Sequence, residues 1–312
     1  PQLKACFFED LGDALFVGDV GRTDFFPVQS KTVAGHLYDS IFQKLLPLSD
    51  HLIVFPAHGA GSVCGEEMAE REFSTLGYEA KHNPALQVKD RETFIDRKVN
   101  EHHYMPPYFK RMEMLNRDGP PRGFKPPFPF PLDVDAFEAR MNNGAIVLDI
   151  RSPEAIGGAL IPGSLGIPME MLPAFAGWFL SYDQDILLVL HDPEESDEAV
   201  RHLYRIGYDR IAGFLNEGLF AWETSGRTYQ TIPSLHAEEL TRRISEKADF
   251  TLLDVRKASE VSRGRLPDSL HIYLGELPEQ LDRIPKDHPV VTFCGSGVRA
   301  VVAATILKQR GF

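Results

Sequence analysis

The sequence predicts an α/β protein whose second half contains two copies of one parallel α/β domain. After residue 130, short apolar segments that end in polar turns alternate with helix-like segments, as in a parallel sheet covered on both faces. Matching motifs recur there at a period of about one hundred residues, which indicates an internal repeat. We therefore place the domains at residues 1–118, 132–229 and 233–312, with a linker over residues 119–131.

The composition is that of a globular protein, and it argues against several kinds of partner and location. The chain has 312 residues and 43% hydrophobic content, enough for roughly two or three domains. A net charge of -12 argues against nucleic acid and anionic membranes as general partners. No apolar run has the length of a membrane span and no signal-peptide pattern opens the chain, so we expect a cytoplasmic protein. Cys6, Cys64 and Cys294 are too scattered for a disulfide framework, which fits a reducing compartment.

Two motifs in the first segment place candidate ligands in turns. Asp13 begins a short apolar run that leads into a glycine-punctuated polar turn containing Asp19. Leu52–Phe55 predicts a buried strand, and His58 follows just beyond its end, where ligands and catalytic groups often lie. From the residue types alone, metal binding by Asp13 and His58 and a structural role are both open, and Asp19 is interpreted as part of the loop architecture.

Other polar residues of this segment have alternative roles. Arg22, in a Gly-Arg-Thr-Asp element, would either hold an anionic thiol substrate or form a structural salt bridge. Cys64 lies six residues after His58 and either approaches a pocket mouth or packs inertly. His102 and His103 are adjacent, and neighbouring side chains rarely face one metal, so we interpret both as surface residues.

A proline-rich linker and an internal repeat follow the first segment. The stretch NRDGPPRGFKPPFPFPL is proline-dense, which predicts a stiff strap at a domain boundary. Three pairs of segments then match: Ala145–Arg151 with Phe250–Arg256, Ile161–Leu165 with Leu266–Leu270, and Ile186–Leu190 with the strand before Cys294. The first of these matches ends in an Asp-x-Arg turn in both copies. We interpret its carboxylates, Asp149 and Asp254, as structural hydrogen-bond partners rather than catalysts.

Pro289–Phe312 contains the strongest candidate for chemistry. Val290–Phe293 predicts a buried strand and Ala300–Gln309 a helix, and the loop between them reads Cys294, Gly295, Ser296, Gly297, Val298, Arg299. Two glycines let successive N–H groups point inward and the helix N-terminus adds partial positive charge, so the loop should hold an anion. A cysteine there, with an arginine closing the loop, should be a nucleophilic thiolate; the alternative is a buried structural cysteine.

This loop resembles that of the rhodanese sulfurtransferases, in which the cysteine carries a sulfane sulfur as a persulfide. The resemblance covers most of residues 130–312 and implies tandem rhodanese-like parallel α/β domains. It implies Cys294 and Arg299 as catalytic residues and the residues between them as the substrate-binding loop. The nearest competitor is the Cys-x5-Arg loop of tyrosine phosphatases. The loop here is one residue shorter, which suits a terminal sulfur better than a tetrahedral phosphate.

The first copy differs at this loop. Aligning the strands puts His191 at the position of Cys294, followed by Asp192, a proline and a run of acidic residues. An imidazole cannot carry a persulfide, and nearby carboxylates repel an anionic ligand. We therefore predict a degenerate, inactive rhodanese domain. A role of His191 as a base or ligand is the alternative.

The first segment, GDALFVGDVGRTDF followed by FPAHGAGSVCG, resembles the C-terminal part of the metallo-β-lactamase αββα sandwich, in the branch of glyoxalase II and the persulfide dioxygenases. The resemblance implies Asp13 and His58 as metal ligands. The other ligands of this fold, all histidine-rich motifs, would precede Asp13, but only twelve residues do so and none is histidine. The chain starts at Pro1 rather than methionine and stops at Phe312 directly after a helix. We therefore expect a fragment truncated at both ends; the alternative is a segment without a metal site.

The domain order resembles bacterial fusion proteins of sulfide detoxification. It implies a non-haem persulfide dioxygenase with one Fe(II) per chain, which converts a persulfide and O2 to sulfite. It also implies a sulfurtransferase that combines sulfite with the Cys294 persulfide sulfur to give thiosulfate. The expected partners are a low-molecular-weight thiol persulfide, sulfite and thiosulfate, and a homo-oligomer is expected. The alternatives are a zinc-dependent glyoxalase II-like thioester hydrolase fused to a sulfurtransferase, and a non-catalytic sulfur-relay scaffold.

Overall fold

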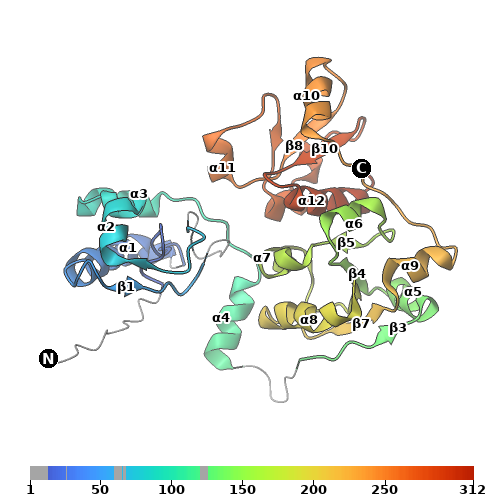
Figure 1. Ribbon diagram of the computed structural model, residues 1–312, viewed down its shortest axis with the longest axis horizontal. Helices are drawn as coiled ribbons and strands as arrows, with labels where there is room; N and C mark the ends of the chain where they lie inside the picture. Colours follow the sequence, from blue (N-terminus) through green and yellow to red (C-terminus); the bar gives the residue numbers. More distant parts are fainter. Residues whose placement is uncertain (1–12, 26, 60–64, 66–67, 120–125) are drawn as a thin grey trace. The chain divides into compact units, whose positions relative to one another are not determined.

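The computed structural model describes residues 13–25, 27–59, 65, 68–119 and 126–312 (Figure 1). The chain divides into two compact units, Pro1–Met105 and Pro106–Phe312. Helices alternate with parallel strands in the second unit, which confirms the predicted α/β class. Within the described ranges, no helix is both long enough and apolar enough to cross a membrane.

The first unit is built around a pair of packed helices and a short hairpin of strands. Its elements are α1 (Ser30–Asp39), α2 (Leu76–His82), α3 (Arg91–Val99), β1 (Ile53–Val54) and β2 (Ser74–Thr75). α1 packs against α3, and β1 pairs with β2 in antiparallel register. Side chains cap the N-termini of two helices: the Thr75 hydroxyl accepts the Tyr78 N–H of α2, and the Asp90 carboxylate accepts the Thr93 N–H of α3. The core consists of Leu15, Val20, Ile41, Val54, Leu76, Leu86 and Phe94.

The predicted buried strand at Leu52–Phe55 is shorter and more exposed than expected. Only Ile53 and Val54 pair with β2, and Val54 is fully buried. The flanking Ile53 and Phe55 side chains are 50% and 53% exposed. Alternating burial is the pattern of a strand covered on one face only, so the apolar run does not mark a strand buried on both faces.

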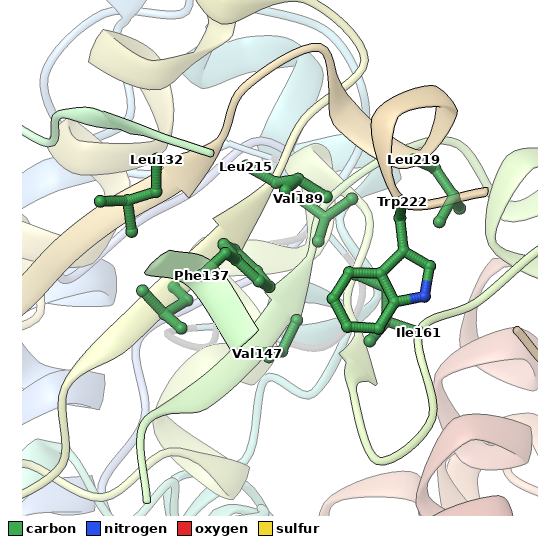
Figure 2. Packing of buried hydrophobic residues seen from close by; sticks show 9 residues of the cluster. Leu132, Phe137, Val147, Ile161, Val189, Leu215, Leu219 and Trp222 are labelled. Carbon is green, nitrogen blue, oxygen red and sulfur yellow. The ribbon is translucent and has the colours of Figure 1, made fainter. Parts of the chain in front are cut away.

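The first repeat copy contains a five-stranded parallel sheet in the order β3-β7-β6-β4-β5. The strands are β3 (Pro131–Leu132), β4 (Ile146–Asp149), β5 (Leu165–Gly166), β6 (Ile186–Val189) and β7 (Ile211–Leu215). The helices are α5 (Val134–Asn142), α6 (Pro153–Gly158), α7 (Leu172–Phe179), α8 (Ser196–Arg205) and α9 (Gly218–Thr224). All of β6 is buried, as expected for a central parallel strand. Figure 2 shows Phe137 and Trp222 meeting in the core, with ring centroids 6.3 Å apart.

The second repeat copy contains a three-stranded parallel sheet in the order β10-β8-β9. Its strands are β8 (Thr251–Asp254), β9 (Leu270–His271) and β10 (Val290–Phe293), and its helices are α10 (Ala237–Ser245), α11 (Ala258–Arg263) and α12 (Val298–Gln309). Among the strands of this described sheet, β10 lies at an edge and all its residues are only partly buried. The sequence predicts β10 correctly as a strand, but not its exposure.

The strand register confirms the internal repeat and corrects the predicted alignment at one point. In both copies the aspartate of the Asp-x-Arg turn lies opposite the last residue of the neighbouring strand, β6 or β10. The next residue is Leu190 in the first copy and Cys294 in the second. His191 therefore lies one position beyond the equivalent of the cysteine, and the predicted alignment of His191 with Cys294 is wrong by one residue.

Helix α4 (Phe109–Asp118) lies in the second unit, although the sequence analysis assigns residues up to 118 to the first domain. The ring of Tyr108, just before α4, packs on Gly177 of α7 so closely that a β-carbon there would lie 2.1 Å from the ring. Arg111 of α4 lies over the Tyr182 ring, 5.4 Å from its centroid. These contacts join α4 to the first repeat copy. The domain limits drawn from the sequence stay predictions.

The two repeat copies share a buried contact along α12 (Figure 1). The Gly166 N–H of β5 donates to the Thr305 hydroxyl oxygen of α12 at 3.1 Å, and both groups are buried. A β-carbon on Gly166 would lie 2.8 Å from Ile156 Cγ2 and 3.0 Å from the Thr305 methyl group, so any side chain at this position would push both neighbours away. Val301 of α12 also joins Ile156 and Leu160 of the first copy in a buried cluster. α12 is thus packed by both copies.

We expect Thr305→Val to destabilise the second unit by about 1–3 kcal/mol, because the buried Gly166 N–H loses its acceptor. Urea unfolding followed by circular dichroism measures the change. Thr241→Val is the matched control, since the Thr241 hydroxyl is exposed and donates to a carbonyl of its own helix. Equal effects of the two substitutions would contradict the assigned role of the contact between the copies.

Candidate active site

Cys294 directly follows β10, and α12 begins at Val298. Gly297 has a φ of 92°, a conformation that residues with a side chain rarely adopt, and its N–H donates to the Cys294 Sγ at 3.1 Å. This N–H and the N-terminus of α12 both stabilise negative charge on the sulfur. The thiol is partly buried, whereas Gly295 and Ser296 are exposed. Of the predicted loop residues, the structure places the Gly297 N–H and the Arg299 guanidinium at the sulfur, and Gly295 and Ser296 are exposed to solvent.

Arg299 lies in the first turn of α12, which starts two residues earlier than the predicted Ala300. Its guanidinium binds both carboxylate oxygens of Glu260, with Nη1–Oε2 at 2.5 Å and Nη2–Oε1 at 2.8 Å. The Glu260 carboxylate raises the pKa of Arg299, and the interaction with the Cys294 thiol adds to this effect. The same pair holds the pKa of Glu260 below its ordinary value. Arg299 thus joins the thiol to a carboxylate.

Glu260 is a site residue that the sequence analysis does not identify. It lies in α11, and its Oε2 also accepts the Lys257 N–H at 3.2 Å, which ties the carboxylate to the start of that helix. Glu260 and Arg299 are separated by 39 residues in the sequence, so no local pattern joins them. The available signal was the position of Glu260 shortly after the Asp-x-Arg turn of the adjacent strand.

The Asp-x-Arg turn forms the same network in both copies. Asp254 is fully buried, and Arg256 donates to its Oδ2 at 2.6 Å and to the backbone carbonyl eight residues further on at 2.9 Å. In the first copy Arg151 donates to Asp149 at 2.7 Å and to the equivalent carbonyl, again eight residues on, at 2.6 Å. This geometry ties the end of β4 in the first copy, and of β8 in the second, to the segment after the next helix. It is the geometry of the structural role predicted for the two carboxylates.

The corresponding loop of the first copy is closed by a carboxylate of its own. Glu195 Oε2 accepts the backbone N–H groups of His191 at 3.0 Å and Asp192 at 3.3 Å. Counted from Leu190, which stands in place of the cysteine, Glu195 occupies the position of Arg299. An apolar side chain thus replaces the thiol, and an internal anion occupies backbone donors of the loop.

The structure brings the two predicted metal ligands of the first unit together. His58 Nε2 lies 3.0 Å from Asp13 Oδ1, and the side chains are 38% and 73% exposed. A nitrogen–oxygen distance of 3.0 Å is that of a direct hydrogen bond or ion pair, and the imidazole and carboxylate are both donor types that bind metals. Over the described ranges, no group of three or more His, Cys, Asp or Glu side chains is placed to hold a metal. Asp13 and His58 therefore fit part of a metal site.

A buried carboxylate fixes the turn next to the predicted ligand aspartate. Glu79 of α2 is fully buried and accepts hydrogen bonds from the Gly18 N–H at 2.8 Å, the Ser74 hydroxyl at 2.5 Å and the Asn83 amide at 3.0 Å. The Asn83 amide also donates to the Asp19 carbonyl oxygen at 3.1 Å. Asp19 thus takes part in the loop architecture, as interpreted from the sequence. Sequence reasoning misses Glu79 because it lies 61 residues from the turn it binds.

Arg22 has the geometry of the structural alternative. Its side chain is 2% exposed and binds the Asp24 carboxylate, with Nε–Oδ1 at 2.9 Å and Nη2–Oδ2 at 2.5 Å. Its Nη1 also donates to the Tyr104 carbonyl oxygen at 3.3 Å. Burial alone would raise the pKa of Asp24, but the hydrogen bonds and charge of Arg22 outweigh it and hold that pKa below its ordinary value. Substrate binding by Arg22 stays a prediction.

His103 is not a surface residue, contrary to the interpretation from the sequence. Its side chain is 6% exposed, and its Nε2 lies 3.1 Å from Glu101. The same carboxylate binds the Lys98 ammonium group at 2.5 Å. His102 is exposed, as expected. Cys64, predicted to approach a pocket or to pack inertly, lies outside the described residues.

The family model of the rhodanese-like domain matches residues 133–225 and 236–312. The chain belongs to the rhodanese-like domain family. A sulfurtransferase from Allochromatium vinosum is 33% identical over 81 residues, which are 26% of this chain and 76% of that protein. The hydroxyacylglutathione hydrolase GloC of Haemophilus influenzae is 38% identical over 78 residues, which are 25% of this chain and 29% of that protein.

A metallo-β-lactamase from Staphylococcus aureus is similar in structure, with a TM-score of 0.53 and 34% sequence identity. The match covers 65% of this chain and 55% of that one, so the chain spans little more than half of the length of this relative. Together with the rhodanese match, this similarity confirms the predicted combination of a metallo-β-lactamase-like segment with rhodanese-like domains.

We expect Asp24→Asn to destabilise the first unit by about 1.5–3 kcal/mol at neutral pH, because the buried Arg22 loses its charged acceptor. The folded-state pKa of Asp24 lies below 3.8, so the carboxylate contributes stability above pH 3.8 and loses it as the pH falls through the folded-state value. The difference between variant and wild type should therefore shrink in acid.

Thermal unfolding between about pH 3 and pH 7 measures this dependence. The control is Asp39→Asn, which breaks the more exposed pair with Arg91 in the same unit and should have a smaller effect. A destabilisation by Asp24→Asn that is unchanged in acid would show that the ion pair is not its cause.

Proposed function

We propose that the second rhodanese copy transfers sulfane sulfur through Cys294. The observation that carries this proposal is the partly buried Cys294 Sγ, which accepts the Gly297 N–H at 3.1 Å beside the guanidinium of Arg299. Such an arrangement stabilises a thiolate, the form of cysteine that attacks sulfur. The sulfurtransferase from Allochromatium vinosum, which the chain resembles over 81 residues, supports the same reaction class.

The proposed reaction has two balanced steps. The Cys294 thiolate attacks the outer sulfur of a low-molecular-weight persulfide; a new S–S bond forms on Cys294 while the donor S–S bond breaks, and the donor thiolate leaves with the electron pair. Sulfite then attacks the outer sulfur of the Cys294 persulfide. Thiosulfate forms, and the electron pair of the broken bond returns to Cys294 as thiolate. The Gly297 N–H and the α12 N-terminus face Cys294 Sγ, which carries the thiolate charge before the first step and again after the second.

We extend the proposal to the metallo-β-lactamase-like segment, which would supply the sulfite as a persulfide dioxygenase. Asp13 and His58 would hold Fe(II), since a carboxylate and an imidazole are suitable donors and the structure places the two side chains together, 3.0 Å apart. Bound iron would supply the redox chemistry that couples O2 to the persulfide sulfur. The Glu79 hydrogen bonds would keep the turn after Asp13 in place. The sulfite made there would be the acceptor for the sulfur on Cys294.

A zinc-dependent thioester hydrolase is the second candidate for this segment. The observation that favours it is the 38% identity to the hydroxyacylglutathione hydrolase GloC over 78 residues. Carboxylate and imidazole donors suit zinc as well as iron, so the Asp13–His58 pair is compatible with both. Oxygen uptake with glutathione persulfide supports the dioxygenase, whereas hydrolysis of a glutathione thioester without oxygen uptake supports the hydrolase.

We expect Cys294→Ser to abolish both the persulfide adduct and sulfur transfer, because an alcohol is far less ionised and less nucleophilic than a thiol. Arg299→Ala should slow transfer by up to roughly 10²–10³-fold but still form the adduct, since the arginine stabilises charge without carrying sulfur. Mass spectrometry of the persulfide-loaded protein and a thiosulfate-formation assay measure the two effects.

The matched control for these variants is His191→Ala in the first copy, which should leave sulfur transfer unchanged because that loop has no thiol. An undiminished transfer rate in Cys294→Ser, with the added sulfur found on Cys64, would show that another cysteine is the carrier.

For the metal proposal, we expect Asp13→Ala to lower the iron content of the natural protein that carries this sequence. The loss should be at least as large as the roughly 10–100-fold effect of removing groups that merely support a ligand. Metal analysis of purified wild type and variant measures it, with the exposed Asp50→Ala of the same unit as control. Full iron occupancy in Asp13→Ala would remove Asp13 from the ligands.

A further inference from the structure

We infer that Glu260 is a specificity-determining positioning residue of the Cys294 loop. It fixes the Arg299 guanidinium and offsets much of its positive charge, so that the loop favours a singly charged thiolate or persulfide over a doubly charged oxyanion. The consequence is a preference for a persulfide as sulfur donor and a weak hold on thiosulfate as product. This inference rests on the proposed sulfur transfer at Cys294.

The first support is the geometry of the pair. Glu260 uses both carboxylate oxygens, at 2.5 and 2.8 Å, so the guanidinium plane of Arg299 is held in one orientation. The Arg299 and Glu260 side chains are only 18% and 32% exposed, so solvent screens their charges less than on an open surface. The Lys257 N–H holds the carboxylate from the other side at 3.2 Å. An incoming anion would have to displace this carboxylate to gain the same two donors.

The second support is the charge balance around the sulfur. Arg299 and Arg256 are cations near the loop, and each is paired with a carboxylate, Glu260 and Asp254 respectively. Beside them, the Gly297 N–H and the N-terminus of α12 face the sulfur and together act as about half a positive charge. That suits one negative charge. A dianion such as thiosulfate, sulfate or phosphate would need a cation whose charge the pair with Glu260 already offsets in large part.

The third support comes from the first copy, which serves as a natural comparison. Six residues after the Asp-x-Arg aspartate stands Glu260 in the second copy and Ala155 in the first. The position of Arg299 is taken by Glu195. The copy that lacks the thiol thus lacks both members of this pair, but it keeps the Asp149–Arg151 pair with the same bonds. The fold therefore does not require the Glu260–Arg299 pair. Of the two copies, the one with the thiol has this pair and the one without the thiol does not.

The test is Glu260→Gln, which removes the charge while nearly preserving shape. Inorganic phosphate should protect Cys294 from alkylation by the neutral reagent iodoacetamide at a concentration at least about tenfold lower than in wild type, because one nearby negative charge is gone. The ratio of kcat/KM with thiosulfate to kcat/KM with glutathione persulfide as donor should rise by about tenfold or more. If Glu260 had a purely structural role, kcat/KM would fall equally with both donors and the ratio would not change.

Two further variants separate charge from position. Glu260→Asp keeps the charge but shortens the arm, so it should retain the low phosphate sensitivity of wild type while transferring sulfur more slowly. Glu138→Gln is the matched control, since it breaks a glutamate–arginine pair of the first copy, in which Arg227 binds Glu138 at 2.9 and 3.0 Å. Both readouts should be unchanged in that variant.

Several results would overturn the inference. Glu260 would have only a structural role if Glu260→Gln lowered kcat/KM equally with both donors and left the protection of Cys294 by phosphate unchanged. If Glu260→Gln does not fold, wild type and Glu260→Asp provide the test. Strong protection of Cys294 from alkylation by phosphate in either protein would contradict the proposed effect of the Glu260 charge. Failure of wild type to form a persulfide on Cys294 would instead refute the proposed sulfur transfer, while the phosphate measurement would still report on the charge of the loop.

Discussion

The position of α12 is the constraint on which the candidate active site depends. The N-terminus of this helix contains the Gly297 N–H that binds the sulfur and, in its first turn, Arg299. Further along, the helix is buried over most of its circumference, from Ala300 to Leu307. A helix that is apolar all round requires partners on opposite sides. The sheet of the second copy provides one, and the first copy provides the other through the buried contact with Thr305.

This packing gives the first copy a physical role that needs no thiol. Its strand β5 approaches α12 closely because Gly166 has no side chain, and Ile156 and Leu160 complete the apolar cover. Hydrogen bonds to sulfur weaken steeply with misalignment, so a helix that is held on two sides keeps the Gly297 N–H directed at Cys294. The first copy also keeps the Asp-x-Arg network. This fits a supporting role, because the network holds the ends of strands in place rather than taking part in the chemistry.

The sequence predicts those features that are encoded by neighbouring residues. The strand, the glycine-rich turn and the helix around Cys294 follow one another in the chain, and the structure contains all three. Glu260 could not be predicted in the same way, because its bond to Arg299 connects different elements. The alignment of His191 fails for a related reason: the apolar run Ile186–Leu190 continues past the last paired residue of β6, so hydrophobicity does not show where the strand ends.

The first segment shows the same limit. Motif spacing places Asp13 and His58 in separate turns, and the structure brings their donor atoms within 3.0 Å. The hydrogen bonds of Glu79 that fix the neighbouring turn come from a distant helix and have no local signature. Burial is likewise a tertiary property: the adjacent His102 and His103 look alike in the sequence, but His102 is exposed, whereas the His103 side chain is buried against the Glu101 carboxylate.

The two loops together separate what the backbone does from what the side chains do. In both copies a strand, a tight turn and a helix direct backbone N–H groups at an acceptor: a thiol sulfur in one, the Glu195 carboxylate in the other. The donors differ: Gly297 in the second copy, and His191 and Asp192 in the first, where Glu195 forms a capping box at the start of a short helix. Three side-chain positions differ together with the acceptor, and in the second copy they hold Cys294, Arg299 and Glu260. The first copy has Leu190, Glu195 and Ala155 there, so its loop binds a carboxylate of its own chain.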